Sequence, residues 1–140
     1  MKTQNIDIKT PDGSCDAYVA YPDEGSYPAV LLYMDAFGLR PYLYEMAQKL
    51  AAHGFYVLVP NVFYRTKRSP IVDMKFPLKL EDMPEAVKFI MPLIHSFSIE
   101  GAMKDAGVYL DFLAKQKNVK GSKVGTTGYC LGGRLSLIHI

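Results

Sequence analysis

One short motif near the end of the chain constrains the fold more than any other feature. Gly128, Cys130 and Gly132 occupy every second position directly after a short β-rich run. In a very tight strand-to-helix turn, the residues two before and two after the tip are pressed together, so neither can carry a bulky side chain. Glycine meets this need at both positions, and Gly133 allows the following helix to pack closely on a sheet. The pattern therefore predicts a strand, a sharp turn that presents Cys130, and a helix.

Two other interpretations of this segment exist. A free cysteine is often buried for structural reasons, and a glycine-rich turn could hold one. A dinucleotide-binding loop is also glycine-rich, but it needs the spacing G-x-G-x-x-G, which the segment from 128 to 133 lacks. The strand before Cys130 and the paired glycines around it favour an exposed, positioned nucleophile.

The hydrophobic pattern upstream predicts a hairpin followed by alternating strands and helices. Residues 5–10 and 16–21 alternate around a Pro-Asp-Gly-Ser turn, whereas residues 29–34 and 55–59 are continuous apolar runs, typical of strands covered on both faces. The remaining predicted elements are helices at 41–53, 81–94 and 99–116 and a strand at 123–127. This order predicts an α/β fold, a three-layer sandwich with an N-terminal hairpin followed by parallel strands.

Length and composition exclude several classes of protein. A chain of 140 residues suits one domain, so we assign residues 1–140 to a single unit with an irregular, lid-like loop at about 61–80. The net charge of +2 gives no basis for binding nucleic acid, and no run approaches the ~20 apolar residues of a membrane span. The N-terminus lacks the apolar core of a signal peptide, which favours the cytoplasm. No ligand spacing for a metal is present, and we expect no cofactor. The oligomeric state is not indicated.

Taken together, these features resemble the dienelactone hydrolase family of α/β-hydrolases over essentially the whole chain. The most specific part of the resemblance is Gly-Tyr-Cys-Leu-Gly-Gly at 128–133. Further anchors are Asp-Ala-Phe-Gly-Leu at 35–39 and Val-Pro-Asn-Val-Phe-Tyr at 59–64. The resemblance implies a hydrolase that acts on a small-molecule ester or lactone through a cysteine nucleophile.

The resemblance also implies roles for individual residues. Cys130 matches the nucleophile, and the backbone N–H groups of Ala36 and Leu131 match the two donors that hold the oxyanion. Asp35 matches an acidic position, commonly glutamate, whose carboxylate interacts with the resting thiol. Independently of the family, an acid at the carboxyl end of a parallel strand lies where α/β proteins bind ligands, although it can equally be a turn or helix-capping residue.

Arginines are the expected partners of a carboxylate-bearing lactone. Arg65 and Arg68 lie in the lid-like loop, and Arg40 follows the segment that contains Ala36. We take Arg65 and Arg68 as candidate substrate-binding residues. The alternative for each arginine is a solvated surface charge.

A complete catalytic set is not expected within these residues. In this fold the nucleophile precedes an acid and then a histidine, and only ten residues follow Cys130. His139 is nine positions further along the predicted helix, ~13 Å from Cys130 along its axis, which is too far for a general base. His53 and His95 are expected to be surface or packing residues. The sequence therefore predicts a truncated hydrolase domain that is inactive by itself, and a non-catalytic binding module or a redox-sensing thiol are the alternatives.

Overall fold

A mixed five-stranded sheet forms the centre of the protein in the computed structural model, which describes residues 1–139. The strands are β1 (Lys2–Thr10), β2 (Gly13–Tyr21), β3 (Tyr27–Tyr33), β4 (Tyr56–Pro60) and β5 (Val119–Gly128). The helices are α1 (Pro41–Ala52), α2 (Met83–Ser96), α3 (Ile99–Ala114) and α4 (Leu131–Leu137), and a 3-10 turn, η1 (Leu80–Asp82), precedes α2.

The sheet order is β1-β2-β4-β3-β5. β1 pairs antiparallel with β2, and β2 pairs antiparallel with β4. β3 lies between β4 and β5 and is parallel to both. Because Tyr33 is the register partner of Gly128, β3 and β5 end at the same level. The segments that follow these two strands therefore begin side by side at the carboxyl ends of the parallel strands.

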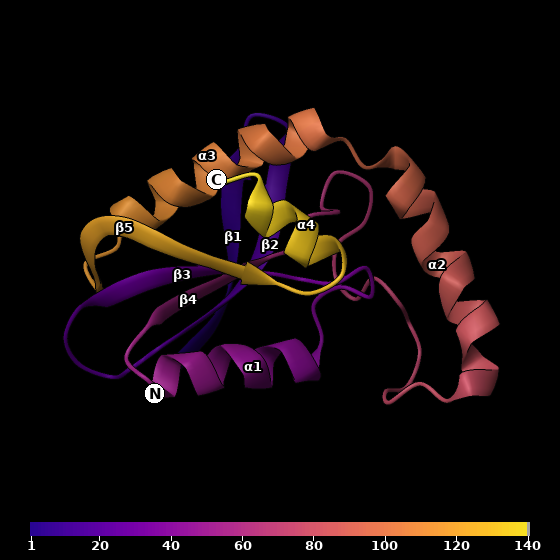
Figure 1. Ribbon diagram of the computed structural model, residues 1–140, viewed down its shortest axis with the longest axis horizontal. Coiled ribbons are helices and arrows are strands. Elements are labelled where there is room, and N and C mark those ends of the chain that lie inside the picture. The colour runs from indigo at the N-terminus through magenta and orange to yellow at the C-terminus, as the bar shows by residue number, and fades with distance from the viewer. Residues whose placement is uncertain (140) are drawn as a thin grey trace.

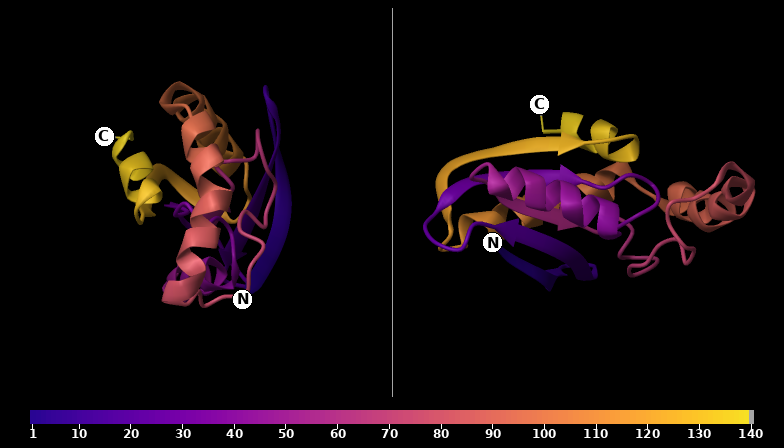
Figure 2. Two further views of the ribbon diagram at one scale, coloured as in Figure 1. Left: turned by 90° about the vertical axis from the view of Figure 1, so that its right-hand side faces the viewer. Right: turned by 90° about the horizontal axis from the view of Figure 1, so that it is seen from below.

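Helices cover both faces of the sheet, which confirms the predicted three-layer α/β-hydrolase-like fold. Figure 1 shows α1 on one side of the strands and α3 on the other, with α4 above the end of β5. Two further views show α2 projecting away from the sheet, beyond the ends of the parallel strands (Figure 2). The apolar runs form the expected core, because β4 is buried along its whole length and β3 is buried from Leu31 to Tyr33.

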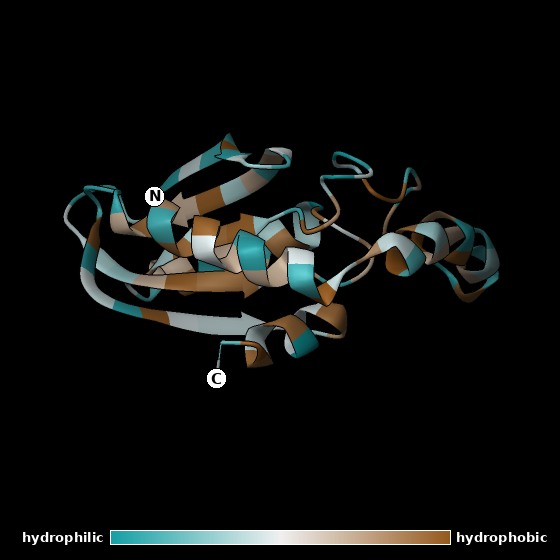
Figure 3. Ribbon diagram, turned by 90° about the horizontal axis from the view of Figure 1, so that it is seen from above, coloured by the Kyte–Doolittle hydropathy of each residue, from teal (hydrophilic) through white to brown (hydrophobic). Residues whose placement is uncertain are grey.

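The last strand differs from its prediction in length. β5 begins at Val119, where Val119 pairs with Tyr27, and only its later part was predicted. Its first residues include Lys120, Gly121 and Ser122, and such polar residues are depleted in strands that are buried on both faces. β5 lies at the edge of the sheet and is largely exposed, so its hydropathy is low, as its pale and teal colours show in Figure 3.

The final helix is shorter than predicted. α4 ends at Leu137, and His139 is already outside it. The prediction that one helix carries both Cys130 and His139 is therefore wrong.

The segment from 61 to 79 contains no helix or strand, as predicted, but it is packed against the domain. Asn61 is fully buried, and its side-chain amide donates to Asp16 Oδ1 and to the Lys67 carbonyl, each at 2.9 Å. Its side-chain oxygen accepts from the Phe63 N–H at 3.0 Å. Ile71 is also fully buried. A buried polar side chain with all its partners satisfied thus anchors the start of this segment to the hairpin.

Candidate active site

The turn at Cys130 has the strained backbone that the glycine spacing predicts. Cys130 has φ 57° and ψ −120°, and it is the only non-glycine residue with positive φ among residues 1–139. Such a conformation costs a residue with a side chain of the order of 1–3 kcal/mol, and it persists only where the surroundings enforce it. Strain of this kind at a cysteine is typical of a functional position.

Two close backbone contacts enforce this turn. A Cβ atom added to Gly128 would collide with the Gly132 backbone, with the Gly132 Cα 2.9 Å away. A Cβ added to Gly132 would lie 2.6 Å from the Met34 carbonyl oxygen and would also collide with the Tyr33 carbonyl. The first contact closes the turn on itself, and the second presses it against the end of β3.

The two cysteines have opposite environments. Cys130 is exposed, whereas Cys15 is fully buried on β2. The Cys15 thiol lies 3.4 Å from both the Tyr109 hydroxyl and the Asn61 carbonyl, and burial raises the pKa of the Cys15 thiol to about 12. Since the thiolate is the reactive form, Cys15 is inert at neutral pH and Cys130 is the thiol that reagents can reach.

Two backbone donors lie beside the turn without a protein acceptor. Ala36 follows the end of β3, and Leu131 follows the end of β5 next to it. Among residues 1–139 no hydrogen bond engages the N–H group of either residue, although Ala36 is only 5% exposed. Buried N–H groups normally have partners, so an unengaged donor at this edge is available to a ligand oxygen.

The Asp35 carboxylate interacts with an arginine rather than with the thiol. Arg40 Nη1 lies 2.6 Å from Asp35 Oδ1, and Arg40 Nη2 lies 2.7 Å from Oδ2. Asp35 Oδ1 also accepts from the Phe37 N–H at 3.0 Å. No hydrogen bond joins Asp35 to Cys130 in the described part of the chain. The structure therefore places Asp35 after the end of β3, with its carboxylate bound to Arg40 and to the Phe37 N–H.

Sequence reasoning missed Arg40 as the partner of Asp35. The signal that could have found it is Gly38, whose φ of 83° reverses the chain between the two residues. Gly38 also packs so closely on Ile71 that an added Cβ would collide with its side chain. This contact connects the segment after β3 to the segment from 61 to 79.

The two candidate substrate arginines occupy different places. Arg65 is held by Asp105 on α3 and by Asp12 in the hairpin turn, each with a closest distance of 2.6 Å, and these bonds raise the pKa of its guanidinium. The structure does not bring it together with Cys130. Arg68 donates to Asp7 at 2.6 Å on the exposed side of the hairpin.

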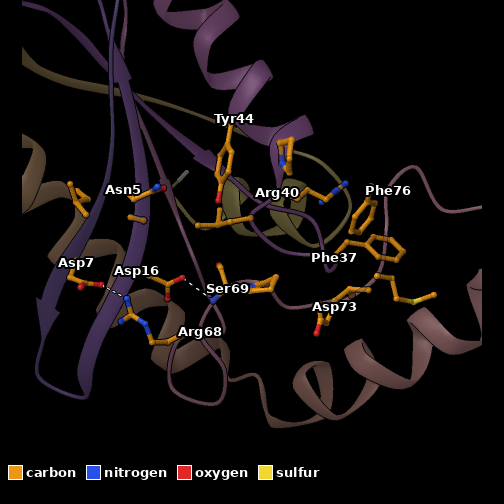
Figure 4. Close-up of a pocket in the computed structure, with 17 residues that line it drawn as sticks. Asn5, Asp7, Asp16, Phe37, Arg40, Tyr44, Arg68, Ser69, Asp73 and Phe76 are labelled. Atoms are coloured by element: carbon orange, nitrogen blue, oxygen red, sulfur yellow. Dashed lines mark hydrogen bonds and ion pairs between the residues drawn. The ribbon is translucent and has the colours of Figure 1, made fainter.

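A large cavity lies between the hairpin, the start of α1 and the segment from 68 to 76. Its volume is about 520 Å³. Figure 4 shows the Asp7–Arg68 pair on one side and Arg40, Phe37 and Phe76 on the other. Cys130 does not line this cavity. Phe37, Leu39 and Arg40, from the segment that follows β3, line one side of it.

No histidine in the described chain is hydrogen-bonded to Cys130. His139 Nε2 lies 2.7 Å from the Tyr33 hydroxyl, and burial lowers the pKa of His139. His53 Nδ1 contacts the Lys49 carbonyl at the end of α1.

Residues 1–139 offer neither a metal-binding cluster nor a membrane-spanning helix. No group of three or more His, Cys, Asp or Glu side chains is arranged to hold a metal ion. No helix is both long and apolar enough to cross a membrane.

Comparison with solved structures agrees with the α/β-hydrolase class that the sheet order and the cysteine turn define. A Klebsiella pneumoniae protein, described as a candidate dienelactone hydrolase, superposes with a TM-score of 0.79 at 18% identity and covers 99% of this chain and 53% of its own. At that identity the likeness establishes the fold alone.

The sequence matches the dienelactone hydrolase family over residues 15–140, so the chain belongs to that family. Carboxymethylenebutenolidase 1 of Cupriavidus pinatubonensis is 25% identical over 97% of this chain and 55% of its own length. Carboxymethylenebutenolidase of Pseudomonas putida is 26% identical over 99% of this chain and 56% of its own. The chain spans about half the length of these curated relatives.

Proposed function

We propose that this chain carries the nucleophile and the oxyanion donors of an ester or lactone hydrolase, with Cys130 as the nucleophile. The strained, exposed conformation of Cys130 is the observation that carries the proposal. Membership of the dienelactone hydrolase family and the names of the two carboxymethylenebutenolidase relatives support a small-molecule ester or lactone as the substrate.

The proposed chemistry begins with attack by the Cys130 thiolate on the substrate carbonyl carbon. A sulfur–carbon bond forms, and the carbonyl electron pair moves to oxygen, where the N–H groups of Ala36 and Leu131 stabilise the negative charge. Collapse of this intermediate expels the alcohol oxygen and leaves a thioester on Cys130. Hydrolysis of the thioester requires a base that activates water, and in this fold the acid and the histidine follow the nucleophile in the chain.

The two candidate arginines are not equivalent in this proposal. Arg68 lines the large cavity and could meet a substrate carboxylate there after leaving its exposed pair with Asp7. Arg65 is already bound to two carboxylates, so we regard it as the weaker candidate for binding a substrate carboxylate. The segment from 61 to 79, which carries both residues, remains the candidate lid.

Acylation of the thiol tests the proposal. The chain is incubated with p-nitrophenyl acetate, release of p-nitrophenolate is followed, and the acylated residue is located by mass spectrometry. Because no histidine among residues 1–139 is bonded to Cys130, we expect a burst of about one equivalent with slow release afterwards. The acetyl group should be on Cys130, the Cys15→Ala variant should keep the burst, and Cys130→Ala should lose it. A full burst from Cys130→Ala would overturn the assignment.

A second candidate function follows from the cavity that excludes Cys130. A non-catalytic module could bind a ligand there without using the thiol at all. In that case Cys130→Ala would bind the ligand as tightly as the wild type. The Cys130 thiol of the wild type would show no acylation.

A further inference from the structure

Arg40 is tied to both ends of the turn that contains Ala36. Its guanidinium holds the Asp35 carboxylate through two parallel hydrogen bonds, and Nη1 also donates to the Gly38 carbonyl at 3.0 Å. The Asp35 carboxylate in turn accepts from the Phe37 N–H. The residues on both sides of Ala36 are therefore fixed by one network that starts at a single side chain.

The surroundings of Arg40 hold the guanidinium in place. Its central carbon lies 5.2 Å from the ring centre of Phe76, 5.7 Å from that of Phe37 and 5.9 Å from that of Tyr42. The side chains of Arg40 and Asp35 are only 13% and 18% exposed. A guanidinium can form two parallel bonds to a carboxylate and pack against aromatic rings at the same time, which an ammonium group cannot do.

We propose that Arg40 is a positioning residue that aims the Ala36 N–H at the developing oxyanion. The inference rests on the proposed function of Cys130 and adds a residue that acts through Ala36 without touching the substrate. β3 and β5 end level with each other, so the segment after β3 begins beside the turn that contains Cys130. The direction of the Ala36 N–H depends on the shape of the turn from 35 to 40, in which Gly38 has a positive φ. Arg40 holds that shape.

Two reactions of the same thiol separate positioning from general reactivity. Acylation by p-nitrophenyl acetate passes through a tetrahedral oxyanion that needs the Ala36 donor. Alkylation by iodoacetamide is a direct displacement at carbon, in which the sulfur–carbon bond forms as iodide leaves and no oxyanion arises. The rate of alkylation therefore depends on the ionisation and the accessibility of the thiol. The rate of acylation depends on these and also on how well the N–H donors stabilise the oxyanion.

The test measures both rates at Cys130 in the wild type and in the Arg40→Lys and Arg40→Gln variants. We expect acylation to fall by roughly 10- to 100-fold in both variants, because displacement of a catalytic group by about 1 Å can cost that much. Alkylation should change by less than about threefold. Asp35→Asn should reproduce the pattern, since it removes the other half of the pair.

Controls separate this effect from loss of fold. Asp105→Asn breaks an equally short arginine–carboxylate pair that has no contact with the turn from 35 to 40, and it should leave the ratio of the two rates unchanged. Alkylation of the buried Cys15 reports unfolding in any variant.

Each remaining outcome has a distinct meaning. If both Arg40 variants stay folded and acylate at the wild-type rate, or if acylation and alkylation fall equally, Arg40 does not position the donor. If wild-type Cys130 is alkylated but never acylated, the proposed function itself is wrong. The two failures are therefore distinguishable.

Discussion

At the scale of single residues, Gly132 shows how little freedom the cysteine turn allows. Its Cα faces the carbonyl groups of Tyr33 and Met34, so the closeness of α4 to the end of β3 depends on the missing side chain. A methyl group there would push the turn away from β3, and with it the Leu131 N–H. Stability and chemistry at this position are limited by the same contact.

Replacement of Gly132 by alanine should therefore destabilise the fold. We expect a loss of about 3 kcal/mol in the free energy of unfolding, measured from urea midpoints, because backbone atoms cannot make room as a flexible side chain can. The matched control is Gly107→Ala in α3, where an added Cβ meets no atom within 4 Å. That change should stabilise the helix by up to ~1 kcal/mol. Equal effects of the two substitutions would contradict this explanation.

The sequence predicted this part of the site because its cause is local. The need for glycine two residues before and after Cys130 follows from the geometry of one turn. The Asp35–Arg40 pair has one local signal, Gly38, but the Phe76 ring that packs on Arg40 is not local. Phe76 comes from a distant, irregular segment whose position no periodicity reveals.

At the scale of elements, the segment from 61 to 79 is fixed at its start by one buried side chain. Asn61 makes three side-chain hydrogen bonds, to Asp16, Lys67 and the Phe63 N–H. Lid-like behaviour would require part of this segment to detach while Asn61 remains in place. The sequence predicted that the segment is irregular. The burial of Asn61 could not be predicted, because no periodic pattern of residues indicates it.

Replacement of Asn61 by alanine should open the segment locally. Loss of buried hydrogen bonds worth about 1–3 kcal/mol should raise the open population by roughly tenfold or more, since 1.4 kcal/mol is a factor of ten. Limited trypsin digestion should therefore cleave faster after Lys67 and Arg68. Asn118→Ala, which removes an exposed hydrogen bond to the Gly25 carbonyl, is the control and should not change the cleavage rate. Unchanged cleavage in Asn61→Ala would show that the packing of Ile71 and its neighbours is sufficient by itself.

At the scale of the whole molecule, the core holds several weak acids in their neutral forms. Burial raises the pKa of Cys15, Tyr56 and Tyr64 to about 12, and the pKa values of Tyr33 and Tyr109 are also raised by burial. Between the ordinary pKa of each group and its raised value, the folded chain holds protons that the unfolded chain has lost. Stability must therefore fall as pH rises through that interval.

Alkaline conditions should unfold the protein for this reason. From about pH 9, the ordinary thiol value, to about pH 12, we expect the free energy of unfolding to decrease, by about 3 kcal/mol or more between pH 8 and pH 11. Urea midpoints at the two pH values measure the change. Cys15→Ala should show a smaller decrease than the wild type because it removes one of the groups. A stability that is flat over this range would mean that the buried groups ionise without unfolding.

The backbone of Cys130 has a consequence for how such a site can change over generations. A φ of 57° with a ψ of −120° suits glycine better than any residue with a side chain. Glycine at position 130 should therefore give the more stable fold, whereas only cysteine supplies the reactive thiol. Stability and reactivity favour different residues at this position. A cysteine there persists only while selection for its sulfur outweighs the gain in stability that glycine would offer. On the proposed function, the cysteine at this position is therefore retained for its sulfur and not for stability.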